Sequence, residues 1–152
     1  MASSKMTKGL FSSNTDLWAT PKAFFEKLNE RFHFTLDPCA NEENHKCDKY
    51  YTIEQDGLKQ DWGGQRVFCN PPYGSAIKHW VKKCYEESLK PDTLVVMLIP
   101  ARTDTSYFHD YIYHKAELEF VRGRLHFNDA PQGAPFPSMV VIFNGKKVMD
   151  KI

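Results

Sequence analysis

The apolar positions of this chain follow two alternating patterns, one with the period of a helix and one typical of buried strands. Between residues 21 and 32 they fall at helical spacing, which predicts an amphipathic helix whose apolar stripe is Phe24, Phe25, Leu28 and Phe32. Thr20 is a preferred N-cap residue and Pro21 suits the first helical position, so we expect this helix to begin there.

Apolar runs elsewhere predict strands. Residues 66–69 and 94–99 read as buried strands that end at Asn70 and Pro100. Residues 33–37 alternate and stop at Pro38, so Asp37 is expected at the end of a strand. Shorter strand-like runs are residues 49–53, 118–121, 124–127 and 139–143.

Two further helices are expected between these runs. The first follows residue 75, with Ser75 as its cap, and its apolar face consists of Ile77, Trp80, Val81, Cys84 and Tyr85. The second covers about residues 105–115. Alternation of strands and helices predicts an α/β sandwich around a largely parallel sheet, in which ligands gather at the carboxyl ends of the strands. Residues 37–40, 70–73 and 100–104 are the polar or turn-forming segments at three such ends.

Composition narrows the class without naming a function. The 152 residues suit one domain, and we expect a polar, flexible tail at residues 1–15 followed by a single domain at residues 16–152. The net charge of +1 gives no support to nucleic-acid binding, for which a basic domain is the usual sign. Neither a signal peptide nor a membrane-length apolar run is present, so a cytoplasmic protein is expected.

The four cysteines contain no Cys-x-x-Cys pair. Cys39, His45 and Cys47 lie close together in sequence, but a structural zinc site usually needs a second short ligand pair, which is missing. We therefore expect no metal and free thiols in a reducing compartment.

The segment Asn70-Pro71-Pro72-Tyr73 carries the most chemical information. Two prolines after a buried strand make the backbone rigid, the Asn70 side chain adds a carbonyl acceptor, and Tyr73 adds an aromatic face. An aromatic amine is a weak nucleophile because its lone pair is delocalised. Acceptors aimed at its hydrogens would favour the pyramidal amine and stabilise the positive charge that develops during methyl transfer. The same four residues could also be only a turn.

The ordered set of motifs resembles the phage-type DNA adenine-N6 methyltransferases. The resemblance covers about residues 16–145 and rests on Leu17-Trp18-Ala19-Thr20-Pro21, Leu36-Asp37-Pro38-Cys39-Ala40, Asp56-Gly57-Leu58, Trp62, Asn70-Pro71-Pro72-Tyr73-Gly74, residues 98–105 and Gly123-Arg124-Leu125-His126-Phe127. It implies a compact Rossmann-like class I methyltransferase sandwich with a largely parallel central sheet and an antiparallel C-terminal strand. It also implies S-adenosylmethionine as cofactor and duplex DNA, with a flipped-out adenine, as substrate.

The resemblance also implies roles for individual residues. Asn70, Pro71, Pro72 and Tyr73 would form the methyl-transfer centre. The cofactor would contact Trp18, Thr20, Pro21, Asp37, Pro38, Cys39, Ala40, Glu54, Asp56, Gly57, Leu58 and Asn70. The substrate would contact Tyr73, Lys78, Arg102, Arg124 and Phe127. The usual Gly-rich turn is absent after Asp37, and the acid that binds the cofactor ribose is left open between Glu54 and Asp48.

Several of these residues also have purely structural interpretations. Arg102 and Asp104 could form a surface ion pair, and Phe127 could belong to the core. Trp18 and Trp62 read as packing residues that could line the cofactor pocket. The loops at residues 41–48 and 128–137 are the candidates for sequence recognition, and a monomer or a homodimer is possible.

Two alternative functions stay open from the sequence. An Asn-Pro-Pro-Tyr acceptor pair would also suit methylation of a protein glutamine or an RNA amine. A phage protein that binds cofactor or DNA without turnover is the second alternative. If a phage encodes the protein, the expected location is the cytoplasm of the host cell.

Overall fold

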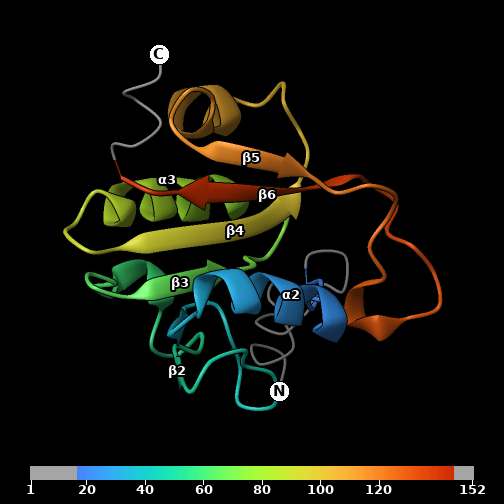
Figure 1. Ribbon diagram of the computed structural model, residues 1–152, viewed down its shortest axis with the longest axis horizontal. Coiled ribbons are helices and arrows are strands. Elements are labelled where there is room, and N and C mark those ends of the chain that lie inside the picture. Colours follow the sequence, from blue (N-terminus) through green and yellow to red (C-terminus); the bar gives the residue numbers. More distant parts are fainter. Residues whose placement is uncertain (1–16, 146–152) are drawn as a thin grey trace, which may run out of the picture.

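Six strands form one sheet with helices on both of its faces, and the computed structural model describes residues 17–145 (Figure 1). The predicted tail at residues 1–15 lies outside the described residues. The elements, in chain order, are α2 (Lys22–Phe32), β1 (Leu36–Asp37), β2 (Lys49–Tyr50), the short turn η1 (Gly57–Lys59), β3 (Arg66–Cys69), α3 (Ile77–Ser88), β4 (Leu94–Pro100), the single wide turn η2 (Phe108–Ile112), β5 (Glu117–Phe120), η3 (Phe127–Asp129) and β6 (Ser138–Phe143).

The strand order is β2-β1-β3-β4-β6-β5, and β2, β1, β3 and β4 run parallel to one another. The last strand, β6, runs antiparallel to both β4 and β5. The predicted α/β class, with a largely parallel sheet and an antiparallel C-terminal strand, is confirmed. The parallel strands all point to the same edge of the sheet, on the right of Figure 1.

The two long helices cover opposite faces because neighbouring strand residues point to opposite sides. Phe68 of β3 packs on Phe25 of α2, with ring centroids 5.1 Å apart. The next residue, Cys69, instead contacts Cys84 of α3. Figure 1 accordingly has α2 in front of the sheet and α3 behind it.

The predicted start of the first helix is wrong by one position. Pro21 occupies the N-cap position, no side chain caps the helix, and Lys22 is the first helical residue. Thr20 does not cap the helix because its hydroxyl accepts a hydrogen bond from Asn70, which directly follows β3.

Other boundaries also differ from the prediction. Ser75 does not cap α3, whose N-cap position is Ala76. Residues 124–126 form no strand, since the backbone turns into η3 at Phe127 and Asn128 adopts a left-handed conformation. The predicted strands 33–37 and 49–53 are reduced to the two-residue strands β1 and β2, and the regular helix expected at 105–115 is replaced by the short turn around η2.

Candidate active site

A cavity of about 970 Å³ opens at the carboxyl ends of β1 and β3. It is lined by every predicted cofactor residue except Pro21, namely Trp18, Thr20, Asp37, Pro38, Cys39, Ala40, Glu54, Asp56, Gly57, Leu58 and Asn70. The structure therefore brings together residues from distant segments of the chain. Pro21 is buried beside them at the start of α2 but does not line the cavity.

Asn70 is held in one orientation by the segment that precedes α2, residues 17–20, which we call the strap. Its Nδ2 donates to the carbonyl oxygen of Trp18 and to the hydroxyl of Thr20 at 2.9 Å. Because a carbonyl can only accept, the amide nitrogen must point to the strap. The other amide atom, Oδ1, is then buried without a hydrogen-bond partner among the described residues.

A buried acceptor without a partner is unusual in a folded protein and costs about 1–3 kcal/mol of stability. Two N–H contacts prevent the amide from turning to relieve it. The strap and Asn70 therefore present an oriented carbonyl oxygen that can accept a hydrogen bond from a ligand.

Asp37 positions the loop that closes one side of the cavity. Its two carboxylate oxygens accept hydrogen bonds from the backbone amides of Cys39 at 3.2 Å and Lys46 at 2.9 Å. Burial raises the pKa of this carboxyl above its usual value, against the opposing effect of those two amides. Asp37 therefore acts on the cavity through the loop it holds.

Gly57 allows the opposite wall to approach that loop. A Cβ atom on Gly57 would lie 2.1 Å from the carbonyl oxygen of Pro38 and 3.2 Å from the ring of Trp80. Asp56, just before it, adopts a left-handed backbone with φ of 57° and accepts from the amide of Leu58 at 3.1 Å. No glycine follows Asp37, so the close approach of the two cavity walls depends on Gly57 in the facing segment.

The charged side chains that line the cavity are mostly acidic. They comprise five acids and one base, Asp37, Glu42, Glu43, Glu54, Asp56 and Lys46. Of the two acids considered for the cofactor ribose, Glu54 lines the cavity and Asp48 does not. No periodic pattern or motif identified Glu42 and Glu43 as cavity residues, because they lie in an exposed loop.

Tyr73 lies in a cluster of four aromatic rings beside Asn70, which we call the ring cluster: Trp18, Tyr73, Phe127 and Phe136. Tyr73 packs edge-on against Phe127 and Phe136, with centroid distances of 6.1 and 5.7 Å. It is only 4 % exposed, and its hydroxyl donates to the carbonyl of Leu98 at 2.9 Å. In this structure no face of Tyr73 is open to solvent, and Phe127 is equally buried.

Phe136 was missed by the sequence analysis. It joins the other three rings, at 5.1 Å from Trp18 and 5.8 Å from Phe127. It stands in a proline-rich loop without apolar periodicity, so no local pattern could have identified it. Trp62 is fully buried and donates its ring N–H to the carbonyl of Gly57, which confirms a packing role.

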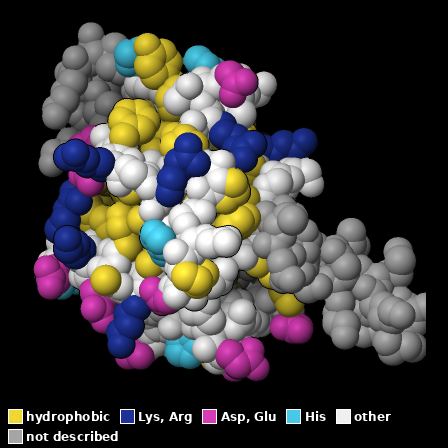
Figure 2. Space-filling view, turned by 90° about the vertical axis from the view of Figure 1, so that its right-hand side faces the viewer, with side chains coloured by type: hydrophobic (Ala, Val, Ile, Leu, Met, Phe, Trp, Pro, Cys, Tyr) yellow, Lys and Arg dark blue, Asp and Glu magenta, His cyan; other side chains and the backbone are white. Residues whose placement is uncertain are grey.

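The predicted substrate residues Lys78, Arg102 and Arg124 are exposed, unlike Tyr73 and Phe127. Figure 2 views the molecule from the right-hand side of Figure 1, where most Lys and Arg side chains lie in the upper and left parts and most acids lie along the lower edge. Arg124 donates to the carbonyl of Ala134 at 3.1 Å. Within residues 17–145, Arg102 and Asp104 form no ion pair, so the alternative interpretation of these two residues is not supported.

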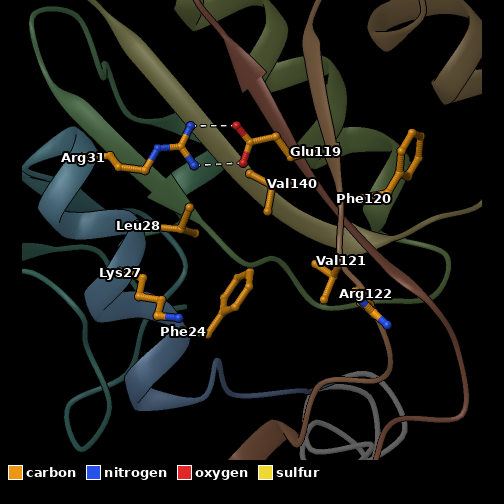
Figure 3. Close-up of a pocket in the computed structure, with 9 residues that line it drawn as sticks. All are labelled: Phe24, Lys27, Leu28, Arg31, Glu119, Phe120, Val121, Arg122 and Val140. Atoms are coloured by element: carbon orange, nitrogen blue, oxygen red, sulfur yellow. Dashed lines mark hydrogen bonds and ion pairs between the residues drawn. The ribbon is translucent and has the colours of Figure 1, made fainter.

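A second pocket of about 340 Å³ lies between α2 and the edge strand β5 (Figure 3). Arg31 and Glu119 bridge it with two hydrogen bonds of 2.8 and 2.6 Å. None of the residues predicted to form the methyl-transfer centre or to contact the cofactor or the substrate lines this pocket. The larger cavity is therefore the candidate active site.

In the described part of the chain, no group of three His, Cys, Asp or Glu side chains is placed to hold a metal ion. All four cysteines are free thiols, and burial raises the pKa of Cys47 to about 12. Of the helices within residues 17–145, none has the length and apolar character needed to cross a membrane.

Comparison with known proteins gives a consistent result. The family model for DNA N-6-adenine-methyltransferase (Dam) matches residues 7–149. The protein of that name from Haemophilus phage HP1 (strain HP1c1) is 32 % identical over 142 residues, which cover 88 % of this chain and 82 % of the phage protein. The protein of that name from Escherichia phage T1 is 36 % identical over 112 residues, which cover 72 % of this chain but only 46 % of the longer phage protein.

Proposed function

The chain belongs to the DNA N-6-adenine-methyltransferase (Dam) family, and we propose that it methylates the N6 amine of an adenine turned out of duplex DNA, with Asn70 receiving that amine. The observation that carries the role of Asn70 is its buried Oδ1, which has no partner among the described residues. An exocyclic amine would supply the missing donor. The cost of leaving the acceptor unpaired before substrate binds is repaid when the amine arrives.

The chemistry follows from the direction of that hydrogen bond. An N–H of the adenine amine donates to Oδ1, which draws the nitrogen toward the pyramidal form and exposes its lone pair. As the nitrogen gains positive charge in the transition state, the same oxygen stabilises it more strongly than in the ground state. The surplus proton leaves to solvent after transfer, so no side chain has to act as a strong base.

S-adenosylmethionine fits the acidic cavity and would supply an electrophilic methyl group there. Its sulfonium and ammonium groups are cationic, and five of the six charged side chains that line the cavity are acidic. A cavity of about 970 Å³ lies in the range of cofactor sites. Glu54 is the acid we assign to the ribose hydroxyls, and Leu58 and Trp80 supply apolar surface for the adenine ring.

The ring cluster is the place we assign to the target base. The amine of adenine is paired inside a duplex, so the base has to leave the stack before it can reach Asn70. Tyr73 and Phe127 are in edge-on contact, with their planes at 90°. Admission of a base between them requires these rings to separate, and stacking on the rings would compensate for that rearrangement.

We assign the phosphate contacts to three exposed basic side chains, Lys78, Arg102 and Arg124. The acidic cavity would repel a polyanion, whereas the more basic upper part of the face in Figure 2 would attract one. Since the substrate is DNA, we expect the protein to act in the cytoplasm, and in the host cytoplasm if a phage encodes it.

Methyl incorporation into nucleosides tests the proposal directly. The protein is incubated with labelled S-adenosylmethionine and, in parallel, duplex DNA without N6-methyladenine, tRNA and a protein extract. We expect label in N6-methyladenine of DNA, with little in tRNA or protein glutamine. Label absent from DNA would refute the substrate, and full activity in Asn70→Ala would refute the assigned centre.

A further inference from the structure

The strap and the β5–β6 loop (residues 121–137) are joined by a reciprocal pair of hydrogen bonds at Asn128. Its backbone N–H donates to the carbonyl of Ala19 at 2.8 Å, and its side-chain Oδ1 accepts from the N–H of Ala19 at 3.2 Å. One residue of the loop thus uses its main chain and its side chain to hold one residue of the strap, 109 positions away. We call this pair the clasp.

Asn128 is suited to this task by its backbone conformation. Its φ of 60° and ψ of 17° lie in the left-handed region, where Asn is among the few non-glycine residues commonly found. Glycine would keep the backbone conformation but lose the Oδ1 acceptor, whereas Asp would keep an acceptor oxygen at the same place. The contributions of backbone and side chain can therefore be separated by substitution.

The clasp stands where three parts of the site meet. The strap and Asn128 both line the acidic cavity. The strap also accepts the two hydrogen bonds that orient Asn70. Phe127, adjacent to Asn128, contacts the rings of Trp18 and Tyr73.

We propose that Asn128 is a positioning residue that couples the cofactor cavity to the ring cluster, so that cofactor and DNA each bind more tightly when the other is present. The inference rests on the proposed function. A cofactor in the cavity contacts the strap and restricts its motion. Through the clasp it then holds Phe127 and the β5–β6 loop in the arrangement that receives the base, and by linkage the base has the same effect on the cofactor.

The test is the ratio of two dissociation constants of sinefungin, an unreactive analogue of the cofactor, measured by calorimetry without and with unmethylated duplex DNA. For the wild-type protein we expect DNA to tighten sinefungin binding by about fivefold or more. In Asn128→Gly the ratio is expected to fall below about twofold. In Asn128→Asp it is expected to stay near the wild-type value, because the acceptor is retained.

Asp129→Gly is the matched control. Asp129 is the next residue of the same loop, also has a positive φ of 51°, and is exposed, yet it makes no hydrogen bond to the strap. Its variant should therefore keep the wild-type ratio, which separates loss of the clasp from loosening of the loop by an added glycine.

The outcomes distinguish this inference from the function on which it rests. Formation of N6-methyladenine is measured on the same wild-type preparation. If the wild type methylates DNA but shows no coupling, or if Asn128→Gly couples as strongly as the wild type, the clasp has no coupling role. An equal loss in Asn128→Asp and Asn128→Gly would likewise overturn it. If the wild type neither binds sinefungin nor methylates DNA, the proposed function itself fails and the inference fails with it.

Discussion

Replacement of Asn70 by alanine should separate stability from activity. The substitution removes two hydrogen bonds from Nδ2 to the strap. It also removes the buried Oδ1, which has no hydrogen-bond partner within residues 17–145. These two effects act in opposite directions on the free energy of unfolding, whereas both act against methyl transfer.

The magnitudes can be worked from the contacts. Two hydrogen bonds contribute about 1 kcal/mol each, and relief of an unpaired buried acceptor returns about 1–3 kcal/mol. The net change in the free energy of unfolding should stay within about 1 kcal/mol, which corresponds to a shift in Tm of no more than about 5 °C. Loss of one oriented group that stabilises transition-state charge typically lowers kcat by about 10²–10³-fold, and we expect at least this for Asn70→Ala.

The assay combines three measurements on Asn70→Ala and the wild type: kcat for methyl transfer to duplex DNA, the dissociation constant of S-adenosylmethionine, and Tm. Because the strap lines the cavity, we expect cofactor binding to weaken by no more than about tenfold. Thr20→Val is the matched control, since it removes one of the two strap acceptors but leaves Oδ1 in place. Its kcat should fall by less than about tenfold.

Three results would refute the reasoning. If Asn70→Ala kept a kcat within about threefold of the wild type, Oδ1 would not stabilise the transition state. If Thr20→Val lost as much kcat as Asn70→Ala, Asn70 would act only by holding the strap. A large loss of Tm in Asn70→Ala alone would show that the residue is structural.

Three further predictions concern stability, the cavity and DNA. Glu87 accepts a hydrogen bond from the backbone N–H of Trp62 at 2.7 Å and forms ion pairs with Lys83 and Lys90. Burial alone would raise the pKa of Glu87, but these contacts outweigh burial, so its pKa lies below the usual value. The folded state then binds fewer protons than the unfolded state, so this stabilisation is present above about pH 4.5 and is lost as pH falls through the lower folded pKa. Glu87→Gln should accordingly cost about 1–3 kcal/mol in denaturant unfolding at pH 7 and less at pH 3. Gly57→Ala places a Cβ 2.1 Å from the carbonyl of Pro38, and it should cost about 1–3 kcal/mol of stability and weaken cofactor binding in calorimetry. Lys78→Gln should raise KM for DNA, lower the slope of binding against salt by about 1, and leave kcat unchanged; an unchanged slope would remove Lys78 from the interface.

The middle of the sheet could be predicted from the sequence because β3, β4 and β6 are buried on both faces. Such strands appear as continuous apolar runs, and the predicted run at residues 66–69 coincides with β3. The buried face of α3 was likewise predicted, since Trp80, Val81 and Cys84 face the sheet at helical spacing. The position of Asn70 directly after β3 followed from the same pattern.

Features that depend on distant partners could not be predicted. Thr20 has every local property of an N-cap, but its hydroxyl contacts Asn70 instead. Residues 124–127 alternate like a strand, yet Phe127 turns into the ring cluster and Asn128 adopts a left-handed backbone. Phe136 has no periodic neighbours at all. In each case a contact across the fold outweighs a local preference.

The net charge of +1 gave no support to DNA binding. The distribution of charges in the structure shows why the total is uninformative. Five acids line the cavity assigned to a cationic cofactor, while Lys78, Arg102 and Arg124, which we assign to the polyanion, are exposed outside that cavity. A protein that binds a cation and a polyanion at adjacent sites needs both signs of charge, and their sum over the whole chain can be close to zero. The electrostatic potential at each site depends on the nearest charges, because charges beyond about 10 Å are largely screened by salt. A near-neutral total is therefore compatible with strong attraction of DNA to one face and of cofactor to the neighbouring cavity.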